Sequence, residues 1–171
     1  MAEKLKQEML PPIVELALLP MAVGQAVIEW SHAERNLLRV MTMLRYEPPK
    51  KLIDDEYFAA RDWWLDRSFD EWKKELGTLA SLQEQSDLKS NIEEVIKVFP
   101  VALDRRNDIV HGYYGGTSED GKREYKRKRH KKEQTEKSVS SLEIWDWIKD
   151  IRSLLLAVGQ IENNISKSEA R

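Results

Sequence analysis

The residues best suited to chemistry lie in the middle of the chain, where residues 104–113 read Asp-Arg-Arg-Asn-Asp-Ile-Val-His-Gly-Tyr. Asn107 and His111 are four residues apart, which places them on one face of a helix, and Arg106 directly precedes Asn107. Metal-independent RNA cleavage needs a group that moves protons and a cation that stabilises charge on the phosphate oxygens. We therefore take Arg106, Asn107 and His111 as the candidate catalytic residues.

His111 is expected in the last turn of its helix. Gly112 follows it, and glycine ends many helices because it tolerates the left-handed backbone conformation. The partial negative charge at a helix C-terminus favours the protonated imidazole, which makes His111 a usable acid or base. A simple hydrogen-bond donor at the helix end is the alternative for this residue.

The pattern of Arg106, Asn107 and His111 resembles the Arg-polar-x3-His motif near the end of the third helix in the HEPN superfamily of small helical ribonucleases. The resemblance implies a metal-independent endoribonuclease that acts by 2′-hydroxyl attack, in a homodimer whose two motifs form one composite site. Tyr113 extends the match to HEPN toxins, in which that tyrosine receives AMP from a nucleotidyltransferase antitoxin. A toxin–antitoxin or defence setting is therefore implied. A non-catalytic HEPN-like interaction or RNA-binding module is the alternative.

Two other arginines fit looser versions of this spacing. Arg105 lies one residue further from His111, but Arg106 follows it where the motif has a polar residue such as Asn. Arg123 and His130 lie in a highly charged run that has no apolar face. Arg106 is therefore the preferred arginine.

Arg106 is expected to point toward packed structure, because at about 100° per residue it shares a helical face with Phe99, Leu103 and Val110. Burial of a lone guanidinium is unfavourable without a carboxylate partner. Glu34 is the predicted partner in a salt bridge that supports the site. The alternative is that this pair only fixes the register of the packed helices.

Glu34 interrupts the apolar seam of the first helix. The expected seam residues follow alternating three- and four-residue steps, as in packed helices: Val27, Trp30, Leu37, Met41 and Leu44. Glu34 occupies the step between Trp30 and Leu37, so its carboxylate is expected on the packed side.

Four principal helices are expected. The first begins near Pro12 or Pro20 and ends near Arg45, where Pro48 and Pro49 stop it. The second covers approximately residues 68–82, and the third runs from Ser86 or Asp87 to Gly112. The last begins at Ser140 or Ser141 and has an apolar stripe that reaches Val158. Ser68 with Glu71 and Ser140 with Glu143 have capping-box spacing. The pattern predicts an all-α, antiparallel up-and-down four-helix bundle in a single domain over residues 1–171. Residues 1–11 form an N-terminal extension, and residues 46–67 form a long connection with one short helix.

Residues 114–139 are expected to form a basic surface loop inserted before the last helix, with a short hairpin around Tyr125. From residue 122 to residue 137, nine lysines or arginines stand against three glutamates. Tyr125 and His130 are available to stack on unpaired bases. The predicted RNA-binding residues are Lys122, Arg123, Lys126, Arg127, Lys128, Arg129, Lys131 and Lys132. A solvated loop without a ligand is the alternative.

Composition excludes several other classes of chemistry. The chain has no cysteine, so disulfides, thiolate metal sites and thiol catalysis are excluded. It contains no His-rich metal motif and no glycine-rich phosphate loop, so we expect neither metal nor cofactor. No apolar run approaches the length of a membrane span, and the N-terminal residues lack a signal-peptide pattern, so a cytoplasmic protein without a membrane partner is expected.

Overall fold

The computed structural model describes residues 12–46, 49–117, 123–127 and 135–169. In these ranges the chain is mainly helical, as predicted. The helices are α1 (Pro12–Met43), α2 (Asp54–Leu65), α3 (Phe69–Leu82), α4 (Ser86–His111) and α5 (Ser141–Glu169). A three-stranded sheet lies between α4 and α5 in the sequence and consists of β1 (Gly112–Thr117), β2 (Arg123–Arg127) and β3 (Thr135–Val139).

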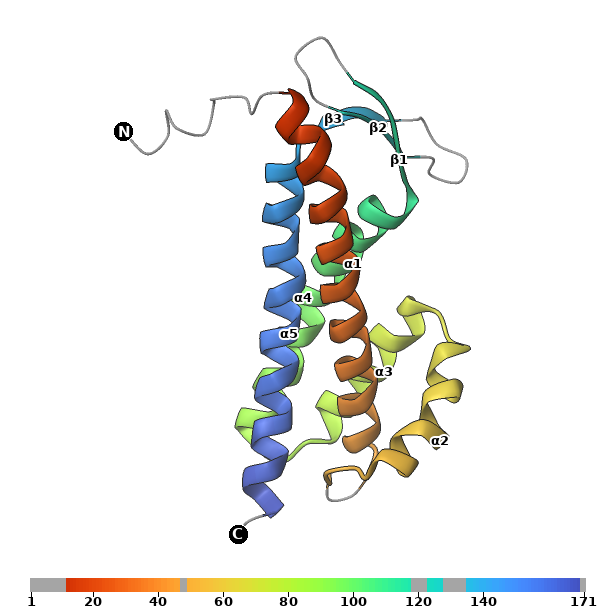
Figure 1. Cartoon of the computed structure of the whole chain (residues 1–171). Helices are drawn as coiled ribbons and strands as arrows, with labels where there is room; N and C mark the ends of the chain where they lie inside the picture. The colour runs from red at the N-terminus through yellow and green to blue at the C-terminus, as the bar shows by residue number, and fades with distance from the viewer. Residues whose placement is uncertain (1–11, 47–48, 118–122, 128–134, 170–171) are drawn as a thin grey trace, which may run out of the picture.

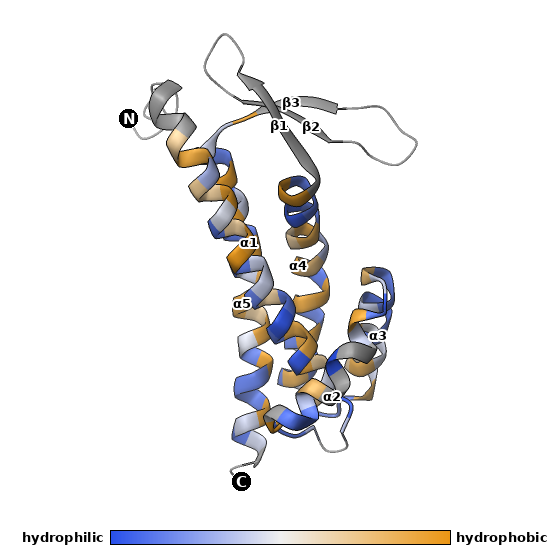
Figure 2. Ribbon diagram, turned by 45° about the vertical axis from the view of Figure 1, so that its right-hand side comes forward, coloured by the Kyte–Doolittle hydropathy of each residue, from blue (hydrophilic) through white to orange (hydrophobic). Residues whose placement is uncertain are grey.

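The three long helices α1, α4 and α5 form the body of the molecule. The most extensive contacts join α5 to α1 and α5 to α4. Figure 1 shows α1 and α5 running in the same direction and α4 running in the opposite direction, with the sheet at the end where α4 finishes. Apolar and polar residues alternate along each long helix in Figure 2, as expected for helices that bury one face.

The connection after α1 contains the helix α2, which packs against α1. The indole Nε1 of Trp64 donates a 2.9 Å hydrogen bond to Oγ1 of Thr42 on α1, and the indole Nε1 of Trp72 on α3 donates to the Trp64 carbonyl at 3.0 Å. Because α2 adds a reversal of the chain, α1 and α5 become parallel. This arrangement departs from the strict alternation expected for four helices.

The apolar seam of α1 is largely as predicted, since Trp30, Leu37, Met41 and Leu44 are buried. The prediction that Val27 belongs to this seam is wrong, because the residue is 43% exposed. The inner face at this level is formed by small residues instead: Ala22, Ala26 and Ala33. Alanines on this face allow neighbouring helices to approach closely, and Val27 then lies outside the interface.

The predicted helix starts of α3 and α5 are confirmed. The Ser68 backbone N–H donates to Glu71 Oε2 at 2.7 Å, and the Glu71 backbone N–H donates to Ser68 Oγ at 3.3 Å. Ser140 and Glu143 repeat this arrangement at 2.9 and 3.3 Å. Each pair satisfies backbone donors that the first helical turn leaves without intrahelical partners.

The all-α prediction requires one correction, because part of the expected basic loop is an antiparallel sheet with strand order β1-β2-β3. Tyr114 on β1 pairs with Tyr125 on β2, and Tyr125 pairs with Lys137 on β3. The backbone groups of β2 therefore find partners on both sides, which a surface loop would leave to water. Val139 ends β3 in a fully buried position in the same hydrophobic cluster as the helices.

Candidate functional site

Arg106 lies on the inner side of α4. The buried residues nearest to it along this helix are Ala102, with no exposed surface, and Ile109, which is 3% exposed. These positions are four residues before and three residues after Arg106, so all three share one face. Arg106 is half-buried there, as its spacing predicts. The expected companion Val110 is instead 46% exposed, because the buried stripe continues through Ile109.

Glu34 faces Arg106 from α1 in a half-buried position. Burial raises the pKa of the Glu34 carboxyl above its ordinary value, while the positive charge of Arg106 lowers it by a smaller amount. The indole N–H of Trp30 also lowers this pKa, although its buried Nε1 has no hydrogen-bond partner at standard geometry among the described residues. The Glu34 carboxylate is therefore held in a partly dehydrated space between α1 and α4.

Glu34 and Arg106 influence each other through their charges without forming an ion pair. Among the ion pairs of the described side chains, none joins these two residues within 4.0 Å. The predicted salt bridge is therefore not formed, although the charge of Arg106 acts on Glu34 at longer range.

Asn107 is tied to Arg106 by a hydrogen bond. The guanidinium Nη1 of Arg106 donates to Oδ1 of Asn107 at 3.0 Å. Because the amide oxygen of Asn107 accepts this bond, the amino group of Asn107 is the part of the side chain that can donate to another group. The two candidate residues thus form one polar unit on α4.

Arg105 is engaged elsewhere. Its Nε donates to Oδ2 of Asp150 on α5 at 2.8 Å, and its guanidinium carbon lies 5.5 Å from the ring centroid of Trp147. These contacts fix Arg105 against α5 as a structural residue. The preference for Arg106 over Arg105 as the motif arginine is consistent with this geometry.

His111 is the last residue of α4, and Gly112 begins β1, so the predicted helix end is confirmed. The backbone places His111 one turn beyond Asn107 on the same face of the helix. The side chains of His111 and Tyr113 lie outside the described part of the structure. Their proposed roles therefore stay predictions.

Only three of the predicted RNA-binding residues lie in the part of the chain that the structure describes. Arg123, Lys126 and Arg127 belong to β2, the central strand of the sheet. The remaining predicted residues lie outside the described residues: Lys122, Lys128, Arg129, Lys131 and Lys132. Because β2 follows β1 in the sheet, and β1 follows His111 directly, these three cations belong to the end of the molecule where α4 terminates (Figure 1).

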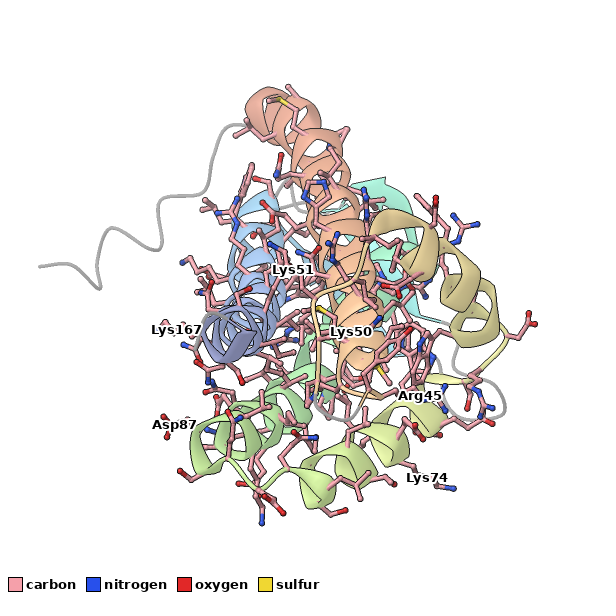
Figure 3. All side chains as sticks on the ribbon, turned by 90° about the horizontal axis from the view of Figure 1, so that it is seen from below. Arg45, Lys50, Lys51, Lys74, Asp87 and Lys167 are labelled. Carbon is pink, nitrogen blue, oxygen red and sulfur yellow. The ribbon has the colours of Figure 1, made fainter. Side chains whose placement is uncertain are left out.

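The opposite end of the molecule also contains cations, shown in Figure 3. Arg45 forms an ion pair with Glu75 at 3.2 Å, and Lys50 forms one with Glu56 at 2.7 Å. Pairing of these cations with carboxylates lowers the local positive charge available to a nucleic acid.

A cleft between α1 and α2 is the feature that sequence reasoning missed. Glu34 lines it, together with Arg35 from α1 and Phe58 and Arg61 from α2. The helical spacing of Phe58 and Arg61 was the available signal. It became meaningful only when α2 was seen to lie against α1.

Among the side chains that the structure describes, no group of three or more acidic or histidine residues is placed to hold a metal ion. None of the described helices has both the length and the apolar character required to cross a membrane. Comparison with known proteins finds no matching family model, no match among curated proteins and no match among solved structures.

Proposed function

We propose that this protein is a metal-independent endoribonuclease of HEPN type that acts on RNA in the cytoplasm. The observation that supports this most directly is the placement of Arg106. It is half-buried on α4, hydrogen-bonded to Asn107, and Asn107 lies one helical turn before His111, the terminal residue of the helix. In this proposal α4 is the motif helix of a HEPN-like bundle.

The proposed reaction joins the 2′-oxygen of one nucleotide to the neighbouring phosphorus and breaks the bond from phosphorus to the 5′-oxygen. A proton leaves the 2′-hydroxyl and another reaches the departing 5′-oxygen, which yields a 2′,3′-cyclic phosphate and a 5′-hydroxyl. His111 would transfer these protons. Arg106 would stabilise charge on the phosphate oxygens, and the amino group of Asn107 would position the phosphate.

The proposed enzyme is a homodimer, because the HEPN resemblance implies that two motifs complete one site. Tyr113 would be the position at which a nucleotidyltransferase antitoxin attaches AMP and silences the enzyme. Both expectations are open to direct measurement. Sedimentation equilibrium would detect the dimer, and mass spectrometry of protein isolated with its antitoxin would detect AMP on Tyr113.

The test of the proposed function is cleavage of a mixed-sequence RNA in EDTA by the parent protein and by His111→Ala. His32→Ala is a matched control, because His32 is an exposed histidine on α1 outside the motif. We expect the parent and His32→Ala to produce 2′,3′-cyclic phosphate ends, and His111→Ala to be inactive. Loss of cleavage in EDTA, or normal cleavage by His111→Ala, would refute the mechanism.

A non-catalytic interaction module is the second candidate. It is favoured by the half-buried pair of Glu34 and Arg106, which can fix helix register without any chemistry. RNA binding without cleavage by the parent protein would support this candidate. In that case His111→Ala would leave binding unchanged.

A further inference from the structure

The cleft between α1 and α2 has a volume of about 290 Å³. This is at the lower end of the range of roughly 300–1,000 Å³ for small-molecule sites, so it suits one flat ring rather than a folded peptide. Aromatic rings and charged groups are among the residues that line it: Glu34, Arg35, Tyr57, Phe58 and Arg61.

One wall of the cleft is aromatic. Phe58 is 47% exposed, and its ring centroid lies 5.3 Å from that of the buried Tyr57, with the rings tilted by 60°. Exposure of so much phenylalanine surface is unfavourable in water. A flat ligand that stacked on Phe58 would remove that surface from water, and the ring of Phe58 is already in contact with the buried Tyr57.

The cleft also contains two cations on opposite helices. The guanidinium carbon of Arg35 on α1 lies 6.0 Å from the ring centroid of Tyr57. The guanidinium carbon of Arg61 on α2 lies 5.6 Å from the ring centroid of Phe58. The aromatic wall therefore has a cation from each helix beside it, which suits the phosphates of a nucleic-acid strand. A base that stacks on Phe58 takes the place of the Arg61 guanidinium over that ring.

Glu34 supplies the hydrogen-bonding group. Glu34 lines the cleft, and its carboxyl group is within electrostatic reach of Arg106. Carboxylates accept hydrogen bonds from the exocyclic amino groups of bases. Glu34 thus connects the cleft to the proposed catalytic arginine.

We propose that the α1–α2 cleft is a subsite for one unpaired RNA base that has an exocyclic amino group, with the base stacked on Phe58 and its amino group bound by Glu34. Unpaired bases are recognised by proteins through this combination of stacking and hydrogen bonding at the base edge. Adenine, cytosine and guanine meet the requirement, and uracil does not. The proposal names the substrate preference of the proposed ribonuclease and so rests on that function.

The test uses fluorescein-labelled 2′-O-methyl tetramers of adenosine, cytidine and uridine, whose blocked 2′-oxygen prevents cleavage. Dissociation constants are measured by fluorescence anisotropy at low salt. We expect the parent protein to bind the adenosine and cytidine tetramers at least about fivefold more tightly than the uridine tetramer. Phe58→Ala should weaken binding of the preferred tetramers roughly 5- to 100-fold, and Phe58→Trp should preserve it.

Two matched controls separate the cleft from general effects. Leu156→Ala removes an apolar side chain that is 71% exposed on α5 and should leave binding unchanged. Arg61→Gln should weaken binding and reduce its salt dependence, whereas Arg67→Gln, outside the cleft, should do neither. Circular dichroism of each variant verifies that α2 is folded.

Equal affinity for all three tetramers, or unchanged binding by Phe58→Ala, would overturn the proposed subsite; the latter result would favour a protein ligand for the cleft. His111→Ala should bind the tetramers normally even though it does not cleave RNA. If the parent protein binds with the expected base preference but cleaves nothing, the subsite stands and the ribonuclease proposal fails. If cleavage depends on His111 but ignores Phe58, the opposite conclusion follows.

Discussion

Arg105 and Arg106 are adjacent, yet we expect Arg105→Gln to lower mainly the stability of the protein and Arg106→Gln to lower mainly its rate of RNA cleavage. Arg105 is held against α5 by its ion pair with Asp150 and by its contact with the ring of Trp147. The side chains of the ion pair are 36% and 37% exposed, so the pair contributes about 0–1 kcal/mol. The cation–π contact adds roughly 0.5–1 kcal/mol.

Arg105→Gln should therefore lower the free energy of unfolding by about 0.5–2 kcal/mol. For a chain of this size that corresponds to a fall in Tm of roughly 1–8 °C. A double-mutant cycle with Asp150→Asn isolates the ion-pair contribution from the stacking on Trp147. RNA cleavage at a temperature where both proteins are folded should stay normal.

Arg106→Gln should lower kcat by about 10²–10³, the usual cost of removing one donor that stabilises transition-state charge. It also removes the charge that lowers the pKa of Glu34, so its effect on stability should be greater at pH 7 than at pH 4. The assays are thermal unfolding followed by circular dichroism and single-turnover RNA cleavage. Loss of cleavage by Arg105→Gln, or full activity of Arg106→Gln, would refute the assignment of roles.

Three further predictions concern stability. Ser68→Ala should cost about 1 kcal/mol in urea unfolding, because α3 loses its capping hydrogen bonds; an unchanged midpoint would contradict this. The hydrogen bond from Arg152 lowers the pKa of Glu29 below its ordinary 4.5. The ionised Glu29 therefore contributes fully to the free energy of unfolding above pH 4.5, and this contribution is lost as the pH falls below that value. Glu29→Gln should make the free energy of unfolding depend less on pH in this acid range. Burial raises the pKa of Glu34, so its ionisation lowers stability as pH rises above 4.5. Glu34→Gln should thus gain stability relative to the parent between pH 4 and pH 7, and a relative loss would show that attraction to Arg106 outweighs burial.

The helix starts were predictable because both partners of each cap lie within four residues. Ser68 with Glu71, and Ser140 with Glu143, make their hydrogen bonds regardless of what packs around them. The inward position of Arg106 was predictable for a similar reason, since helical periodicity relates it to the apolar residues of its own helix. Periodicity was less reliable for Val27 and Val110, because small residues can take the inner positions.

The sheet was beyond local patterns, because strand pairing depends on segments separated by several residues of chain. Tyr125 was correctly placed in a hairpin, but its second partner Lys137 on β3 was not foreseen. The many charged residues in β2 led to the prediction of a loop rather than a strand, because such a run of charge is typical of a solvated loop.

By itself, the sequence determined the caps, the helical periods and the order of Arg106, Asn107 and His111 along α4. These features depend on interactions within one or two turns of backbone. The tertiary structure decided which helices meet. Only the packing of α1 against α4 shows that Glu34 lies beside Arg106 without a direct contact, and only the packing of α2 against α1 creates the cleft with Phe58. Contacts between helices join surfaces from distant parts of the chain, so helical periodicity predicts which face of a helix is buried but not which helix covers it.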